Sequence, residues 1–143
     1  MSFSETISPF FGRCAFVWFY GAVAMNILTN WHGVVAQLDG RHVPLAPVAL
    51  VVALVLVVLG CISLLFGYHT RHGAVLLFGL TIVAAVLLHD FWHVPDGPGR
   101  WAEFDIFARD VAICGGLLLM VGMGAGPFAI DNRSGGGGKG KRR

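Results

Sequence analysis

Four long stretches with almost no charge are the feature that most constrains how this chain can fold. They cover roughly residues 10–30, 46–67, 72–92 and 106–125. A hydrocarbon core about 30 Å thick requires about 20 helical residues, and each stretch supplies close to that length. Lipid offers no partner to a backbone N–H or C=O group, so each stretch should be a helix. The sequence therefore predicts an all-α membrane protein built as a four-transmembrane-helix bundle.

The positive charges predict how this bundle is oriented. Four spans put both termini on one side of the membrane. The basic residues on that side are Arg13, Arg71, Arg133, Lys139, Lys141, Arg142 and Arg143. The opposite side holds Arg41, Arg100 and Arg109. Because Lys and Arg gather on the cytoplasmic side, we expect both termini to be cytoplasmic. Residues 1–131 are predicted to form the membrane domain, and residues 132–143 a flexible, Gly-rich basic tail.

Polar residues gather at the predicted outer ends of three spans. They are Asn26 and Asn30 on the first span, His89, Asp90, Trp92 and His93 on the third, and Arg109 and Asp110 on the fourth. Ionisable groups beside lipid are costly, so we expect them to pair with one another inside the bundle. His89 and His93 are four residues apart and would share one face of a helix.

Three interpretations of these polar residues remain open. The plainest is a hydrogen-bonded network that ends the helices. The second is a site for a small ligand such as a quinone, in which His89 would donate to a carbonyl and Arg109 would hold an anion. The third is a metal or haem site on His89 and His93, which the absence of an evident third ligand and of a facing histidine disfavours. We therefore predict no metal and no certain cofactor.

Small residues on the fourth span predict close helix packing. Ala108, Ala112 and Gly116 recur every four residues, and small residues let helices approach closely in lipid. This span is therefore predicted to be the interior helix of the bundle. The same residues could instead pack the helix of a partner protein.

Several motifs resemble the DoxX family of small bacterial inner-membrane proteins. They are His89-Asp90-Phe91-Trp92, Arg109-Asp110-Val111-Ala112, Gly115-Gly116-Leu117-Leu118-Leu119 and the Gly-rich exit that runs to Asp131. The resemblance covers about residues 8–131. It implies a multi-pass protein of the bacterial inner membrane, and a link to redox complexes, since relatives resemble the membrane subunit of thiosulfate:quinone oxidoreductase.

These observations lead to three hypotheses about function. The first is a subunit of a redox or quinone-linked complex, without activity of its own, that contacts the bilayer and either a partner protein or further copies of itself. The second is an assembly subunit that binds no ligand. The third is a small transporter, against which the lack of charge deep in the first three spans counts. No feature of the sequence points to nucleic acid.

Overall fold

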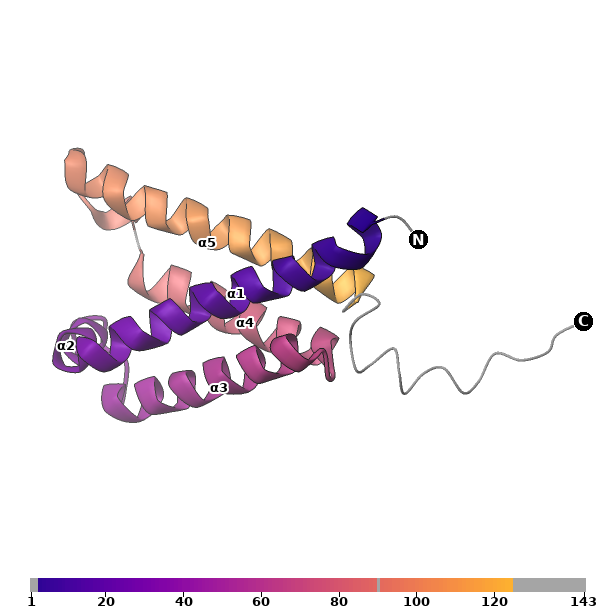
Figure 1. Ribbon diagram of the computed structural model, residues 1–143. Helices are drawn as coiled ribbons and strands as arrows, with labels where there is room; N and C mark the ends of the chain where they lie inside the picture. Colours follow the sequence, from indigo (N-terminus) through magenta and orange to yellow (C-terminus); the bar gives the residue numbers. More distant parts are fainter. Residues whose placement is uncertain (1–2, 90, 125–143) are drawn as a thin grey trace, which may run out of the picture.

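The described part of the computed structural model comprises residues 3–89 and 91–124, with side chains from residue 7 onward, and it contains helices but no strand. The elements are α1 (Phe3–Thr29), α2 (Trp31–Gly40), α3 (Ala46–Phe66), α4 (Thr70–Leu88), the 3₁₀ turn η1 (Phe91–His93) and α5 (Pro98–Met123) (Figure 1). Four stretches are long and apolar enough to cross a membrane: Ile7–Thr29, Ala46–Phe66, Thr70–His93 and Pro98–Met123. The predicted all-α architecture with four membrane-spanning helices is confirmed.

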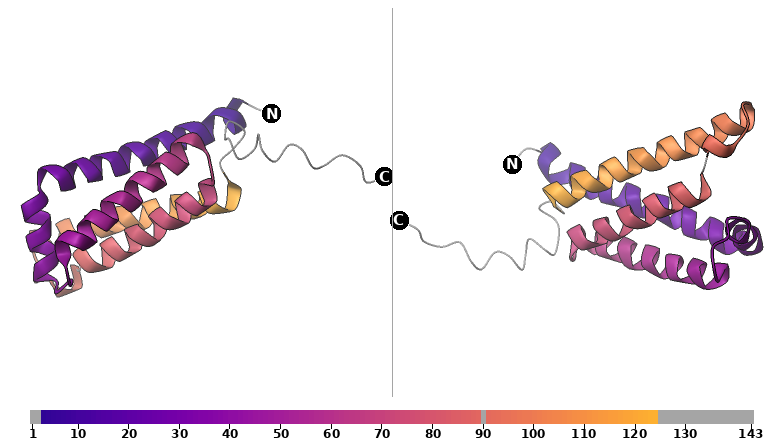
Figure 2. Two further views of the ribbon diagram at one scale, coloured as in Figure 1. Left: turned by 90° about the horizontal axis from the view of Figure 1, so that it is seen from below. Right: turned by 180° about the vertical axis from the view of Figure 1, so that it is seen from behind.

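The spans form a bundle in which chain neighbours pack together. Helix α1 lies beside α3, α3 beside α4, and α4 beside α5. The start of α1, the α3–α4 turn and the end of α5 lie at one end of the bundle, which we call the inner end (Figure 2). Helix α2, η1 and the start of α5 lie at the opposite end, which we call the outer end. Which end faces the cytoplasm stays a prediction.

The surface and the core of the bundle are both apolar. The core joins Tyr20, Val57, Leu64, Ala74, Leu77 and Leu117. Many large apolar side chains point outward, among them Val51, Val55 and Ile62 of α3, each about half exposed. An apolar surface of this extent is typical of a protein that contacts lipid.

Helices α3 and α4 approach each other closely in the core. A Cβ atom placed on Gly60 would lie 2.5 Å from Cγ of Leu77, so only glycine fits there. At the inner end of this pair, Ser63 Oγ donates to the carbonyl of Tyr68 at 2.7 Å. Gly67 ends α3 in the left-handed conformation, with φ of 66°, which glycine adopts without strain. Together these contacts make α3 and α4 a tight hairpin.

The first outer connection differs from the loop expected over residues 31–45. Residues Trp31–Gly40 form helix α2, which is too short to cross a membrane. Val34, Val35 and Leu38 recur at helical spacing, and Leu38 is buried against Ala46 and Leu50 of α3. This apolar face explains why the connection is helical.

The third span ends earlier than expected, at Leu88 instead of residue 92. His89 has left the helix, with φ of −116° and ψ of 59°, and Arg41 Nη2 donates to the carbonyl of Leu88 at 3.3 Å. His93 belongs to the separate turn η1. The prediction that His89 and His93 share one helical face is therefore wrong. Asp90, which was grouped with them, lies outside the described residues.

The fourth helix begins earlier than expected, at Pro98 instead of residue 106. Proline is well suited to the first position of a helix because its missing N–H has no intrahelical partner there and its φ is already helical. The eight extra residues move the beginning of α5 away from Arg109 and Asp110. Both residues consequently lie well inside the helix, not in its first turn.

Candidate functional site

At the outer end, a hydrogen bond joins the segment that follows α4 to α5. His89, which follows α4, has its Nδ1 atom 2.9 Å from Oε2 of Glu103, and both side chains are partly buried. Glu103 lies in the second turn of α5, a stretch that the sequence analysis placed outside the span. The carboxylate of Glu103 therefore orients His89 and occupies one of its two ring nitrogens.

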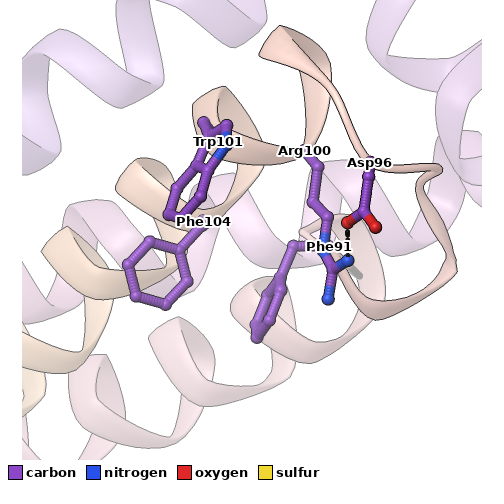
Figure 3. Close-up of a pocket in the computed structure, with 5 residues that line it drawn as sticks. All are labelled: Phe91, Asp96, Arg100, Trp101 and Phe104. Carbon is purple, nitrogen blue, oxygen red and sulfur yellow. Dashed lines mark hydrogen bonds and ion pairs between the residues drawn. The ribbon is translucent and has the colours of Figure 1, made fainter.

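A shallow pocket of about 410 Å³ lies at the outer end. Its lining consists of Phe91, Asp96, Arg100, Trp101 and Phe104 (Figure 3). The rings of Phe91 and Phe104 meet edge to face with centroids 5.3 Å apart, and Arg100 pairs with Asp96. The pocket thus combines flat apolar surfaces with one guanidinium and one carboxylate.

A second polar level lies deeper, where α1 and α4 meet. The Tyr20 hydroxyl and Thr81 Oγ1 are 2.5 Å apart and buried. Thr81 Oγ1 also lies 2.8 Å from the Leu77 carbonyl, to which it donates. A threonine hydroxyl has a single proton, so Tyr20 must be the donor in the bond between the two side chains.

Helix α5 brings a carboxyl group and a guanidinium to this deeper level. Asp110 is buried. Arg109 lies 5.5 Å above the ring centre of Phe19, and its Nη2 atom is 3.4 Å from Oδ1 of Asp110. That separation is long for a hydrogen bond, so the pair is weak. The Arg109 side chain remains 53% exposed.

The depth of Arg109 follows from its contact with α1. Phe19 precedes Thr29, the last residue of α1, by ten residues, or ~15 Å at the helical rise. A hydrocarbon core is about 30 Å thick, so Arg109 and Asp110 lie near its middle. The expectation that all the polar residues share one level at the outer boundary is therefore wrong, because α5 begins at Pro98.

The predicted site residues accordingly separate. Asn26 and Asn30 lie at the junction of α1 and α2, and neither lines the pocket. Trp92 and His93 belong to η1, where Trp92 packs against Phe107 with ring centroids 6.1 Å apart. The residues that sequence reasoning missed are Tyr20, Thr81, Asp96, Arg100, Trp101, Glu103 and Phe104. Pro98 was the available signal for those on α5, because it marks the start of a helix that contains them.

The predicted packing residues of α5 divide between two faces. A Cβ atom on Gly116 would lie 2.7 Å from Cζ of Phe16, so this glycine permits α1 to approach α5. Ala108 and Ala112 are exposed instead, and so is Gly115, which has open space around its Cα. The face with Ala108, Ala112 and Gly115, which we call the small face of α5, is not covered by the described part of this chain.

Within residues 3–89 and 91–124, no three His, Cys, Asp or Glu side chains are grouped so that they could hold a metal ion. The three cysteines, Cys14, Cys61 and Cys114, are free thiols.

Comparison with known proteins places the chain in a family. The model of the SURF4 family matches residues 45–135. The inner membrane protein YphA of Escherichia coli is 28% identical over 106 residues, which cover 74% of this chain and 75% of that protein. The Surfeit locus protein 4 homolog of Schizosaccharomyces pombe is 32% identical over 81 residues. No solved structure matches the chain at a significant level.

Alignments with the eukaryotic relatives cover only part of those proteins. The match to the Schizosaccharomyces pombe protein spans 55% of this chain but 26% of the relative. The ER-derived vesicles protein ERV29 of Saccharomyces cerevisiae is 27% identical over 79 residues, which make up 25% of its length. The matched part of the chain, about half of it, thus corresponds to about a quarter of each eukaryotic relative.

These matches correct the resemblance proposed from the motifs around His89 and Arg109. The family model that matches is that of SURF4, and nothing among the relatives points to DoxX. Two of the four motifs, Gly115–Leu119 and the Gly-rich exit, are short apolar or glycine-rich runs, which recur in many spanning helices because lipid and close packing favour the same residues.

Proposed function

Since the chain belongs to the SURF4 family and carries four membrane-spanning helices, we propose that it is a non-catalytic assembly subunit. In this role it binds a transmembrane helix of a partner protein against the small face of α5. The redox role that the sequence suggested depended on the DoxX resemblance and loses its support with it.

Arg109 carries this proposal. Its side chain is 53% exposed at mid-depth, and its contact with Asp110 is long. A guanidinium that faces acyl chains at this depth is costly, and such residues usually face another protein surface or a polar cavity. A partner helix over the small face would remove Arg109 from lipid and supply the acceptor that Asp110 supplies only weakly.

The shape of the small face fits a helix. Ala108, Ala112 and Gly115 lie within about 60° of one another around α5, and none has a large side chain. Small residues allow two backbones to come close, which strengthens van der Waals contact and interhelical hydrogen bonds in lipid. Arg109 lies at the edge of this face.

Charge indicates what kind of helix binds. Two copies of this chain related by a twofold axis along the membrane normal would bring one Arg109 toward the other. Like charges at that depth would oppose such a dimer. The partner is therefore a different helix with a carboxylate near its midpoint.

A defined peptide tests this proposal. Energy transfer in phosphatidylcholine vesicles would be measured between the labelled full chain and a leucine-rich transmembrane peptide that carries one central Glu. We expect the wild type to bind it ~5–30-fold more tightly than Arg109→Leu does, because interhelical polar bonds in model peptides contribute about 1–2 kcal/mol. A peptide with Leu in place of the Glu should bind both chains equally weakly.

A matched glycine pair provides the control for shape. Gly115→Leu should weaken binding because it fills the small face, whereas Gly79→Leu, at an equally open position on α4, should not. Equal binding of the Glu and Leu peptides to the wild type would refute the proposal. So would an unchanged affinity in Arg109→Leu.

A flat aromatic ligand in the outer pocket is a second candidate function. The pocket offers Phe91, Phe104 and Trp101 as ring surfaces and Arg100 as a donor. A quinone-like molecule would suit it, although His89, the donor proposed from the sequence, is bound to Glu103 and does not line the pocket. Quenching of tryptophan fluorescence by a water-soluble quinone should be lost in Trp101→Phe, and its persistence would remove this candidate. The transporter hypothesis gains no comparable support.

The bacterial inner membrane remains our proposal for the location of this multi-pass protein. The match to an inner membrane protein of Escherichia coli supports it, because that alignment covers three quarters of both chains. The eukaryotic relatives, one of them a protein of ER-derived vesicles, are matched over a smaller share. Fractionation of the native host's membranes would test the location.

A further inference from the structure

Arg13 is a buried cation in the inner half of α1. Its residue exposure is 3%, and it lies six residues, or ~9 Å, inside the start of the span at Ile7. Its Nε and Nη1 atoms are buried, and neither has a hydrogen-bond partner among the described residues. The guanidinium lies 5.8 Å from the ring centre of Phe10.

The nearby ring does not compensate this charge. A cation–π contact stabilises a guanidinium, but it offers no acceptor to the N–H groups that Arg13 buries. A buried charge that is neither paired nor hydrogen-bonded is strongly destabilising, so an anion with acceptor atoms is expected beside it.

The spanning helices themselves supply no such anion at this level. No Asp or Glu occurs between residues 6 and 38, between 40 and 89, or between 111 and 130. The inner end instead holds a second cation, Arg71 in the first turn of α4. A Cβ atom on Gly124, where α5 ends, would lie 3.8 Å from Nε and Nη2 of Arg71.

The direction of the Arg13 side chain brings its charge toward the headgroups. Side chains of a helix lean toward its N-terminus, which for α1 is the inner end. The guanidinium of Arg13 is therefore closer to the headgroups of the inner end than its Cα atom is.

We propose that Arg13 binds the phosphate of a phospholipid headgroup at the inner end, with Arg71 as a second cation. A phosphodiester has several acceptor oxygens, and arginine is well matched to phosphate. The basic inner end favours an anionic phospholipid. This site involves neither Arg109 nor the small face of α5, so it stands independently of the proposed function.

Thermal unfolding of the purified full chain in detergent tests the site. Dioleoylphosphatidylglycerol should raise the Tm of the wild type, whereas dioleoylglycerol, which lacks the phosphate, should not. Arg13→Gln should weaken the apparent affinity for phosphatidylglycerol ~10–100-fold, the loss expected for hydrogen bonds to a charged group. Arg13→Lys, which keeps the charge but not the planar donors, should bind with intermediate affinity and guards against a folding defect in Arg13→Gln.

The controls separate other sources of the anion. Arg41→Gln, at the outer end, should respond to phosphatidylglycerol as the wild type does. Inorganic phosphate should leave the Tm unchanged, and an equal stabilisation by it would overturn the assignment to a lipid. Glu5→Gln and Asp131→Asn, which remove the acid that precedes the first span in the sequence and the acid that follows the last span, should retain the lipid response. If the wild type and both Arg13 variants bind the lipid equally, the proposal is wrong.

Discussion

The single hydroxyl proton of Thr81 determines the direction of the hydrogen bond between two spans. Its hydroxyl donates to the Leu77 carbonyl in its own helix, which leaves only its lone pairs for Tyr20. The bond between α1 and α4 therefore runs in one direction, from the tyrosine to the threonine. A residue at position 81 must accept a hydrogen bond and cannot depend on donating one.

Removal of either hydroxyl should destabilise the bundle modestly. We expect Tyr20→Phe and Thr81→Val each to lower the free energy of unfolding by about 0.5–2 kcal/mol, the range of interhelical hydrogen bonds in membrane proteins. Unfolding in a denaturing detergent, followed by far-ultraviolet circular dichroism, would measure the change.

A double-mutant cycle isolates this bond from other effects of the two substitutions. The double variant should lose less stability than the sum of the losses in the two single variants, because the bond can be removed only once. Thr81→Ser, which keeps the hydroxyl, should resemble the wild type. Strictly additive losses in the double variant would show that the two hydroxyls do not interact.

The contact between His89 and Glu103 at the outer end should contribute less. His89 and Glu103 are both partly exposed, and exposed pairs are typically worth about 0–1 kcal/mol. We therefore expect Glu103→Gln to change the Tm little but to free the orientation of His89. A marked change in the chemical shifts of the His89 ring in Glu103→Gln, with the Tm preserved, would agree with this role, whereas an unchanged ring would not.

At the scale of the elements, the α3–α4 hairpin is a closely packed unit. Gly60 lies under Leu77, and Ser63 closes the inner turn. Gly79 lies on the same helix as Leu77 but faces open space. The two glycines thus occupy opposite environments within one pair of helices.

Alanine at these two glycines should have opposite effects. Gly60→Ala inserts a methyl group 2.5 Å from Leu77 and should destabilise the protein by about 1–3 kcal/mol. Gly79→Ala meets no neighbour and should be neutral or stabilising, because alanine favours a helix over glycine. Thermal unfolding of both variants in the same detergent would show the difference, and equal Tm values would contradict this view of the hairpin.

The sequence predicts the spans more reliably than their ends. Uninterrupted apolar stretches sufficed for α3 and for most of α1 and α4, since few other structures can hide so much backbone in lipid. The start of α5 was missed because Arg100, Glu103 and Asp105 interrupt its apolar pattern. Charged residues in the first turns of a spanning helix remove the hydropathy signal that would mark where it starts.

The candidate site was harder to predict than the spans. Its contacts depend on the depth and rotation of helices that are distant in sequence, as with Tyr20 and Thr81, 61 residues apart. The prediction that His89 and His93 share a helical face was wrong for a local reason, because the helix ends at Leu88. A polar pattern alone therefore identified the right kind of residue but assigned Arg109 and Asp110 to the wrong depth.

At the scale of the whole molecule, the inner and outer ends differ in charge. Arg13 and Arg71 lie at the inner end, where the described chain both begins and stops. The positive-inside rule assigns this end to the cytoplasm. The same rule allows few basic residues outside, and Arg41 and Arg100 there are bound to Leu88 and Asp96.

Fusions would test this orientation directly. Alkaline phosphatase joined after residue 143 should be inactive in a bacterial host, because the enzyme folds only outside the cytoplasm. A green fluorescent protein at the same position should fluoresce. The reverse pair of results would place the inner end outside and would contradict the proposed cytoplasmic termini.

The short inner turn has a consequence for how the protein is made. Only residues 67–69 separate α3 from α4. A connection this short keeps the two helices side by side while they insert into the membrane. The nascent chain must deliver them to the bilayer as one inserted pair. Helices α1 and α5, which carry the intramembrane charges, can then pack against the apolar surface of this pair.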